Sequence, residues 1–84
     1  MFKEIVLDCR ELEAPEPLHL ITENLYKINS EYYIKMLHRM EPQMLLSILH
    51  SNGYAYIIRH INHEVNIYIY EKNNLAQKKY IESL

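Results

Sequence analysis

Residues 7–18 (LDCRELEAPEPL) contain the only thiol of the chain and two of its three prolines. A thiolate is the nucleophile in sulfur transfer and thiol redox chemistry, and a helix N-terminus stabilises it. Pro15 and Pro17 are typical of such a helix start, but Cys9 comes several residues earlier, with Arg10 beside it as a cation that could stabilise a thiolate. We therefore consider two roles for Cys9: a reactive thiol, or a small buried apolar side chain, which is the commoner state of a free cysteine.

Histidines and carboxylates supply the second group of candidates. A metal site needs three or four converging ligands, and the five histidines show no spacing typical of one, so a weak metal site is only an alternative to scattered surface histidines. The acidic residues near the helix starts favour capping over paired-carboxylate acid/base chemistry. The candidate ligand-binding residues are Asp8, Arg10, His38, Arg39 and Glu41. With no phosphate loop, catalytic triad or zinc motif, we expect a non-enzymatic protein without a metal or cofactor.

Apolar patterns predict the elements that position these residues. Short β-branched runs predict strands, and apolar residues at steps of three and four predict helices. Gly53 tolerates the left-handed conformation that ends a helix. The predicted strands are 4–8, 31–38, 54–61 and 65–71, and the predicted main helices are 17–29 and 42–52. The C-terminal tail 73–84 is predicted to form a short helix with Ala76, Tyr80 and Leu84 on one face and Ile81 beside them.

The order β-α-β-α-β-β predicts a two-layer α/β sandwich. Right-handed crossovers place both main helices on one face of a four-stranded mixed sheet. Eight tyrosines are unusual for 84 residues. Strand alternation predicts three of them on the face of the sheet away from the two main helices, and Tyr54 or Tyr56 could join them there. An exposed aromatic patch is typical of an interface. The predicted interface residues, for self-association or a protein partner, are Tyr33, Tyr68 and Tyr70; the alternatives are that the tail covers this face or that the tyrosines reflect strand propensity.

The segment 7–18 resembles the signature of the TusA/SirA-like sulfur carriers, in which Leu-Asp is followed after a few residues by Cys-Pro-x-Pro. Ala14 stands where those carriers have their reactive cysteine. The resemblance covers residues 4–71 and is closest to an uncharacterised bacterial branch that lacks this cysteine. It implies the same element order but no sulfur transfer at the motif position. The residues that match position by position are Asp8, Pro15 and Pro17.

Length and charge limit the remaining function classes. Eighty-four residues predict one domain, 1–84, and a net charge of −2 without a basic run argues against a nucleic-acid partner. The chain has no apolar run of roughly 20 residues for a membrane span, and its single thiol and N-terminal sequence favour the cytoplasm. We expect a protein-interaction or regulatory module. The alternatives are a sulfur-trafficking or redox carrier using Cys9, and a small-ligand or metal-binding module using His38, Arg39 and the helix N-termini.

Overall fold

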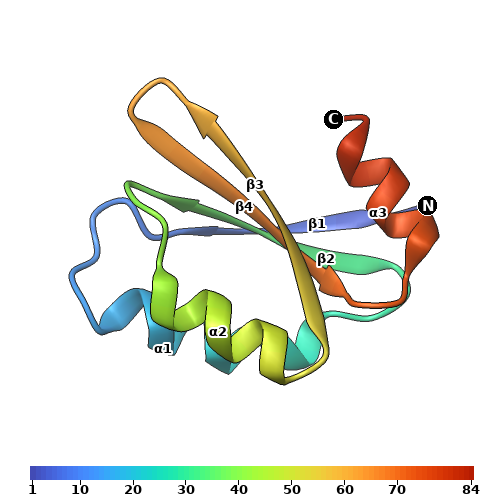
Figure 1. The fold of residues 1–84 in the computed structure, drawn as a ribbon, viewed down its shortest axis with the longest axis horizontal. Helices are drawn as coiled ribbons and strands as arrows, with labels where there is room; N and C mark the ends of the chain where they lie inside the picture. The colour runs from blue at the N-terminus through green and yellow to red at the C-terminus, as the bar shows by residue number, and fades with distance from the viewer.

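Four strands form one mixed sheet in the order β1-β2-β4-β3 (Figure 1). The computed structural model describes residues 1–84. Strand β1 is parallel to β2, whereas β4 is antiparallel to both β2 and β3. The predicted element order and four-stranded mixed sheet are confirmed. In chain order the elements are β1 (Lys3–Asp8), α1 (Glu16–Asn24), the 3₁₀ helix η1 (Leu25–Lys27), β2 (Tyr32–His38), α2 (Gln43–Ser51), β3 (Tyr54–Ile61), β4 (Glu64–Glu71) and α3 (Leu75–Glu82).

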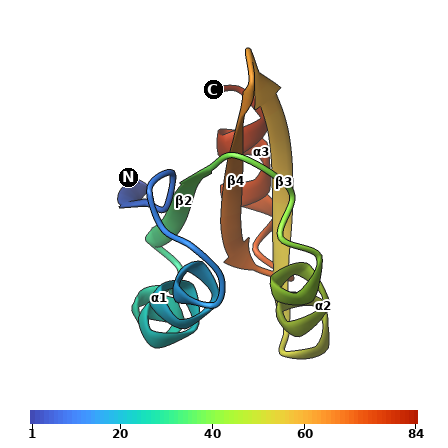
Figure 2. The same ribbon diagram turned by 90° about the vertical axis from the view of Figure 1, so that its left-hand side faces the viewer.

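Helices α1 and α2 lie together on one side of the sheet, and α3 lies apart from them (Figure 2). The core beneath α1 and α2 is aliphatic, because alternate residues of the central strands β2 and β4 point toward these helices. Burial of such side chains is the main favourable term in folding. The fully buried members of this core include Ile21, Ile34, Met36, Leu49, Ile67 and Ile69.

The first helix is shorter than its apolar pattern predicts. Helix α1 ends at Asn24, and the chain continues as the 3₁₀ turn η1. The Thr22 hydroxyl donates to the carbonyl of Leu18 at 2.9 Å, and the Asn24 amide donates to the carbonyl of Leu20 at 2.7 Å. Such bonds from polar side chains compete with the regular helix pattern near its end. The second helix ends as predicted, with Gly53 at φ +84°.

Helix α3 covers the face of the sheet that carries the three predicted interface tyrosines. Tyr33, Tyr68 and Tyr70 are between 1% and 4% exposed and pack with Ile81 of α3. They therefore form no exposed patch, and the alternative that the tail covers this face describes the structure. Of the predicted face of α3, only Ile81 is buried; Gln77 is buried beside it, whereas Ala76, Tyr80 and Leu84 are exposed.

The additional tyrosines were predicted on the wrong face. Tyr54 and Tyr56 pack against the aliphatic core beneath α1 and α2. The pairing of β3 with β4 explains this, because Tyr56 lies directly opposite Ile69, and opposite residues of an antiparallel pair share a face. No helix of the fold is both long and apolar enough to span a membrane.

Candidate functional site

A pocket of about 380 Å³ lies where the parallel strands β1 and β2 end and helices α1 and α2 begin. Two loops, residues 9–15 and 39–42, connect these strand ends to the helices. Crevices at the carboxyl ends of parallel strands are common ligand sites in α/β proteins. Nine of the fourteen lining residues are apolar: Leu12, Ala14, Pro15, Pro17, Leu18, Met40, Pro42, Met44 and Leu45.

Two methionines form an apolar rim on this pocket. Met40 and Met44 are 65% and 69% exposed, although both side chains are large and hydrophobic. Methionine is flexible and polarisable, and it is frequent at surfaces that adapt to a ligand. The rim therefore extends the apolar lining of the pocket to the surface. The predicted motif position Ala14 lies in the same lining.

His38 is the buried polar residue of the pocket. It lies opposite Val65 in the β2–β4 pairing, so its side chain shares the face of the aliphatic core. The residue is 6% exposed, and its Nδ1 atom has no hydrogen-bond partner. Burial lowers the pKa of His38. Hydrogen bonding to the backbone of Cys9 acts in the opposite direction, and the positive charge of Arg39 lowers the pKa further. Burial in the aliphatic core therefore favours the neutral form of the imidazole.

Both helices that border the pocket begin without a side-chain cap. The residues at their N-cap positions are Pro15 and Pro42, which have no side-chain oxygen to accept a hydrogen bond. The backbone N–H groups of Gln43, Met44 and Leu45 have no acceptor in the protein. Proline is favoured at a helix start because it lacks an N–H of its own, but it leaves the following N–H groups free.

The charged residues at the mouth of the pocket are paired with one another. An Arg39 nitrogen lies 3.6 Å from a Glu13 oxygen and donates to the Leu12 carbonyl at 3.2 Å. A ring nitrogen of His60 lies 2.8 Å from a carboxylate oxygen of Glu41. Each of the two carboxylates that line the pocket, Glu13 and Glu41, therefore has a partner. The structure thus brings three predicted candidates, His38, Arg39 and Glu41, to one pocket.

The other two candidates, Asp8 and Arg10, lie outside this pocket and bind each other. The Arg10 guanidinium donates to both carboxylate oxygens of Asp8, at 2.9 and 2.7 Å, and reaches Glu64 at 3.3 Å. Hydrogen bonds from the Arg10 side chain and backbone lower the pKa of Asp8 to about 2. Through Arg10, these contacts connect Asp8 at the end of β1 to Glu64 at the start of β4. Asp8 and Arg10 therefore have a structural role in the fold.

Cys9 is buried in the aliphatic core and is 0% exposed. Burial raises the pKa of its thiol, and the charge of Asp8 raises it further. A thiol in such surroundings is a poor nucleophile because the thiolate is disfavoured. The position agrees with the interpretation of Cys9 as a small buried apolar side chain. No group of three or more His, Cys, Asp or Glu side chains is arranged to hold a metal ion.

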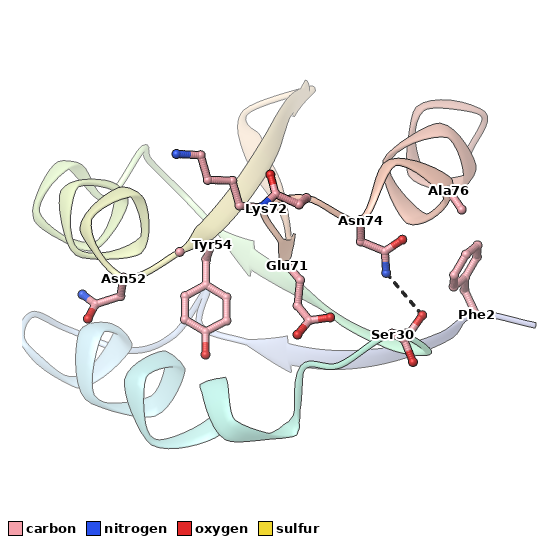
Figure 3. Close-up of a pocket in the computed structure, with 10 residues that line it drawn as sticks. Phe2, Ser30, Asn52, Tyr54, Glu71, Lys72, Asn74 and Ala76 are labelled. Atoms are coloured by element: carbon pink, nitrogen blue, oxygen red, sulfur yellow. Dashed lines mark hydrogen bonds between the residues drawn. The ribbon is translucent and has the colours of Figure 1, made fainter.

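A second, more open groove of about 770 Å³ lies at the opposite end of the sheet (Figure 3). It is lined by Phe2, by Ser30 and by residues from the segments 52–54 and 71–76. Asn74 donates to the Ser30 carbonyl at 3.3 Å, and most other lining residues are exposed. This groove has no sequence motif, because its lining residues are distant in the chain. It gathers no buried functional group that a ligand would satisfy.

Sequence reasoning missed part of the pocket. The sequence patterns predict helix starts at the prolines, but they do not predict the free N–H groups after Pro42 or the exposed rim methionines. The free N–H groups have a signal in the sequence, because a proline at the N-cap position has no side-chain oxygen to accept from them. Comparison of the chain with protein-family models, with curated proteins and with solved structures gives no match.

Proposed function

We propose that this protein is a non-enzymatic binding or regulatory module, and that its binding site is the pocket between the N-termini of α1 and α2. The observation that carries this proposal is His38, a residue that lines the pocket and whose buried Nδ1 has no hydrogen-bond partner. Buried polar groups nearly always have a partner, so an exception in a residue that lines a pocket supports a ligand there. The volume of about 380 Å³ lies in the usual range of small-ligand sites.

The proposal includes the TusA/SirA-like relationship. The residues that carry the resemblance, Pro15 and Pro17, line this pocket together with Ala14 at the position of the missing cysteine. The domain would have retained the fold and the location of the site, and replaced a covalent carrier function by binding. A cytoplasmic location and a protein partner or second copy belong to the same proposal. The single buried thiol and the exposed rim methionines support them.

A fragment screen by amide NMR tests the proposed site. Neutral, anionic and cationic fragments are added to the labelled protein, and we expect shift changes to concentrate at residues 12–18 and 38–45. Two matched variants separate the cavities: Ala14→Phe fills this pocket, and Ala76→Phe fills the groove at the opposite end. Binding should be lost only in Ala14→Phe. Fragments that bind only at the opposite groove, or a screen without binders, would overturn the proposal.

Alkylation of Cys9 distinguishes the proposal from sulfur trafficking. Because the thiol is buried and its pKa is raised, iodoacetamide should modify it at the rate of unfolding, with little reaction in the native state. Intact mass after exposure of native and urea-treated protein measures this. Rapid modification of the native protein would favour the carrier alternative.

A further inference from the structure

We propose that the pocket between α1 and α2 binds a small carboxylate with an apolar body, and that the N–H groups at the start of α2 and the His38 side chain hold the carboxylate. This inference rests on the proposed function, because it names the ligand class of the same pocket. Four features carry it: the free N–H groups, His38, the paired charges at the mouth, and the apolar lining.

The start of α2 offers several hydrogen-bond donors to one ligand. The N–H groups of Gln43, Met44 and Leu45 have no acceptor, and these three residues line the pocket. The first N–H groups of a helix point out of its end, where the helix dipole favours negative charge. A carboxylate has two oxygens that can each accept more than one hydrogen bond. It therefore matches this set of donors better than a neutral carbonyl does.

His38 is an independent indication of a ligand in the same place. It belongs to strand β2 and not to either helix, it is 6% exposed, and its Nδ1 has no partner. In the tautomer with hydrogen on Nδ1, the ring donates to an acceptor. Because His38 lines the same pocket as the start of α2, this ring is the side-chain donor available there to a carboxylate that α2 holds.

The charges at the mouth favour a single carboxylate over a phosphate. The two acidic residues that line the pocket, Glu13 and Glu41, are occupied by Arg39 and His60. A phosphate dianion would need several cations, and Arg39 is the only lining residue with a permanent positive charge. A single negative charge can instead be held by the N–H groups of the helix N-terminus.

The rest of the pocket suits an apolar ligand body. Leu12, Leu18 and Leu45 line it, and the exposed side chains of Met40 and Met44 extend the apolar surface outward. Covering these methionines on binding would remove apolar area from water, which is favourable. The ligand would thus place its carboxylate at the helix start and its hydrocarbon against the leucines and methionines.

Three six-carbon probes with different head groups test the ligand class: hexanoate, 1-hexanol and hexylammonium. Titrations followed by amide NMR should show hexanoate shifting the signals of Gln43, Met44 and Leu45, with an affinity about tenfold above that of either other probe, as expected for charge-assisted hydrogen bonds. Equal affinities would overturn the carboxylate inference and leave the proposed binding site in place. No binding by hexanoate would also overturn the inference, and the fragment screen would then decide the proposed function separately.

A pair of variants tests the free N–H groups directly. Gln43→Pro removes one of them at the first position of α2, where proline is tolerated, and Gln43→Ala keeps it. Gln43→Pro should weaken hexanoate about tenfold relative to Gln43→Ala, with 1-hexanol binding unchanged. If Gln43→Pro fails to fold, His38→Leu removes the other donor while keeping an apolar side chain, and it should weaken hexanoate selectively. Unchanged hexanoate affinity in the folded variants contradicts the inference.

The carboxylate could belong to a free acid or to the C-terminus of a polypeptide. An acetylated tripeptide that ends in leucine, with a free and with an amidated C-terminus, separates these sources. Tighter binding by the free-carboxylate peptide than by hexanoate assigns the site to polypeptide ends. Tighter binding by hexanoate assigns it to free acids. Equal binding by the free and amidated peptides, with hexanoate also no better than 1-hexanol, overturns the inference.

Discussion

The two faces of the sheet are covered in different ways. Helices α1 and α2 cover an aliphatic core of eleven buried residues, and the unpaired Nδ1 of His38 lies on this side, in a residue that lines the pocket. The other buried side-chain atom without a partner, Nε2 of Gln77, belongs to α3. Helix α3 covers three tyrosines whose contacts are more polar. The Tyr33 hydroxyl donates to Glu4 at 2.7 Å, and the Arg59 guanidinium lies 5.5 Å from the centre of the Tyr68 ring.

The attachment of α3 shows what separates the two faces. Only Gln77 and Ile81 of this helix are buried. Arg59 of β3 holds its C-terminal end by donating to the carbonyls of Ile81 at 3.0 Å and Glu82 at 2.9 Å, and also to that of Leu84. A segment with few buried apolar contacts opens at lower free energy than the core. The face beneath α1 and α2 therefore provides global stability, and α3 is a locally attached cover.

The largest expected effect separates a core isoleucine from one beneath α3. Ile67 and Ile81 are both 0% exposed. Ile67→Ala should lower the free energy of unfolding by about 2–5 kcal/mol, as for other buried large-to-small changes. Ile81→Ala should lower it less, because α3 can detach while the sheet stays folded. Urea denaturation measures both, and hydrogen exchange should show the Ile81→Ala loss confined to α3. Equal losses in the two variants would show that both faces unfold as one unit.

Arg59 tests how α3 is held. Its side chain makes hydrogen bonds to helix carbonyls and lies over an aromatic ring, so Arg59→Ala should lower the stability of α3 by about 1–2 kcal/mol after allowance for partial exposure. The measurement is hydrogen exchange of α3 amides, with α1 amides as the internal reference. Arg59→Lys is the matched control: it keeps the charge but loses the planar set of donors, so it should restore only part of the protection. Unchanged exchange in Arg59→Ala would contradict this role.

Much of the fold could be predicted because alternation and helix spacing are local. The residues of β2 and β4 that face the helices follow from a period of two, and the end of α2 follows from Gly53. The predictions failed where a long-range contact decides. The side of β3 that carries Tyr56 depends on its pairing with Ile69. The burial of Gln77 next to the predicted Ile81 depends on how α3 is turned toward the tyrosines.

The candidate site was predictable in part for the same reason. His38, Arg39 and Glu41 lie between the end of a strand and the start of a helix, so their common location follows from the element order. The partners of the candidate residues cannot be predicted in this way, because they are distant in the chain. Glu41 pairs with His60, 19 positions away, and Arg10 reaches Glu64, 54 positions away. Both partners belong to strands of the β3–β4 hairpin, whose position over the loops is a tertiary property. The free Nδ1 of His38 likewise depends on packing.

The pH dependence of stability tests whether His38 is the unsatisfied group of the pocket face. Burial lowers its pKa below the ordinary 6.5, so the unfolded chain binds a proton more readily than the native protein. Its contribution to stability is then fully present above pH 6.5 and is lost as the pH falls from there through the lower native pKa. Urea denaturation at pH 7.5 and pH 5 should show this decrease in the wild type, and His38→Gln should reduce it. An identical decrease in His38→Gln would assign the pH dependence to other groups.

The smallest effect concerns Asp8, a carboxylate close to the pocket that is already satisfied. Hydrogen bonds from Arg10 hold its pKa at about 2, against an ordinary value of 3.8. Because the pKa of Asp8 is lower in the native protein than in the unfolded chain, its contribution to stability is present above pH 3.8. This contribution is lost as the pH falls from 3.8 through 2. Carboxyl NMR titration should show the pKa of Asp8 returning toward 3.8 in Arg10→Gln, while Glu64→Gln leaves it low. Stability at pH 7 should change little, because an exposed ion pair contributes little to it. An unchanged pKa in Arg10→Gln would mean that Asp8 is stabilised by another group, and that the contrast between paired surface charges and an unpaired buried histidine does not hold at this end of the sheet.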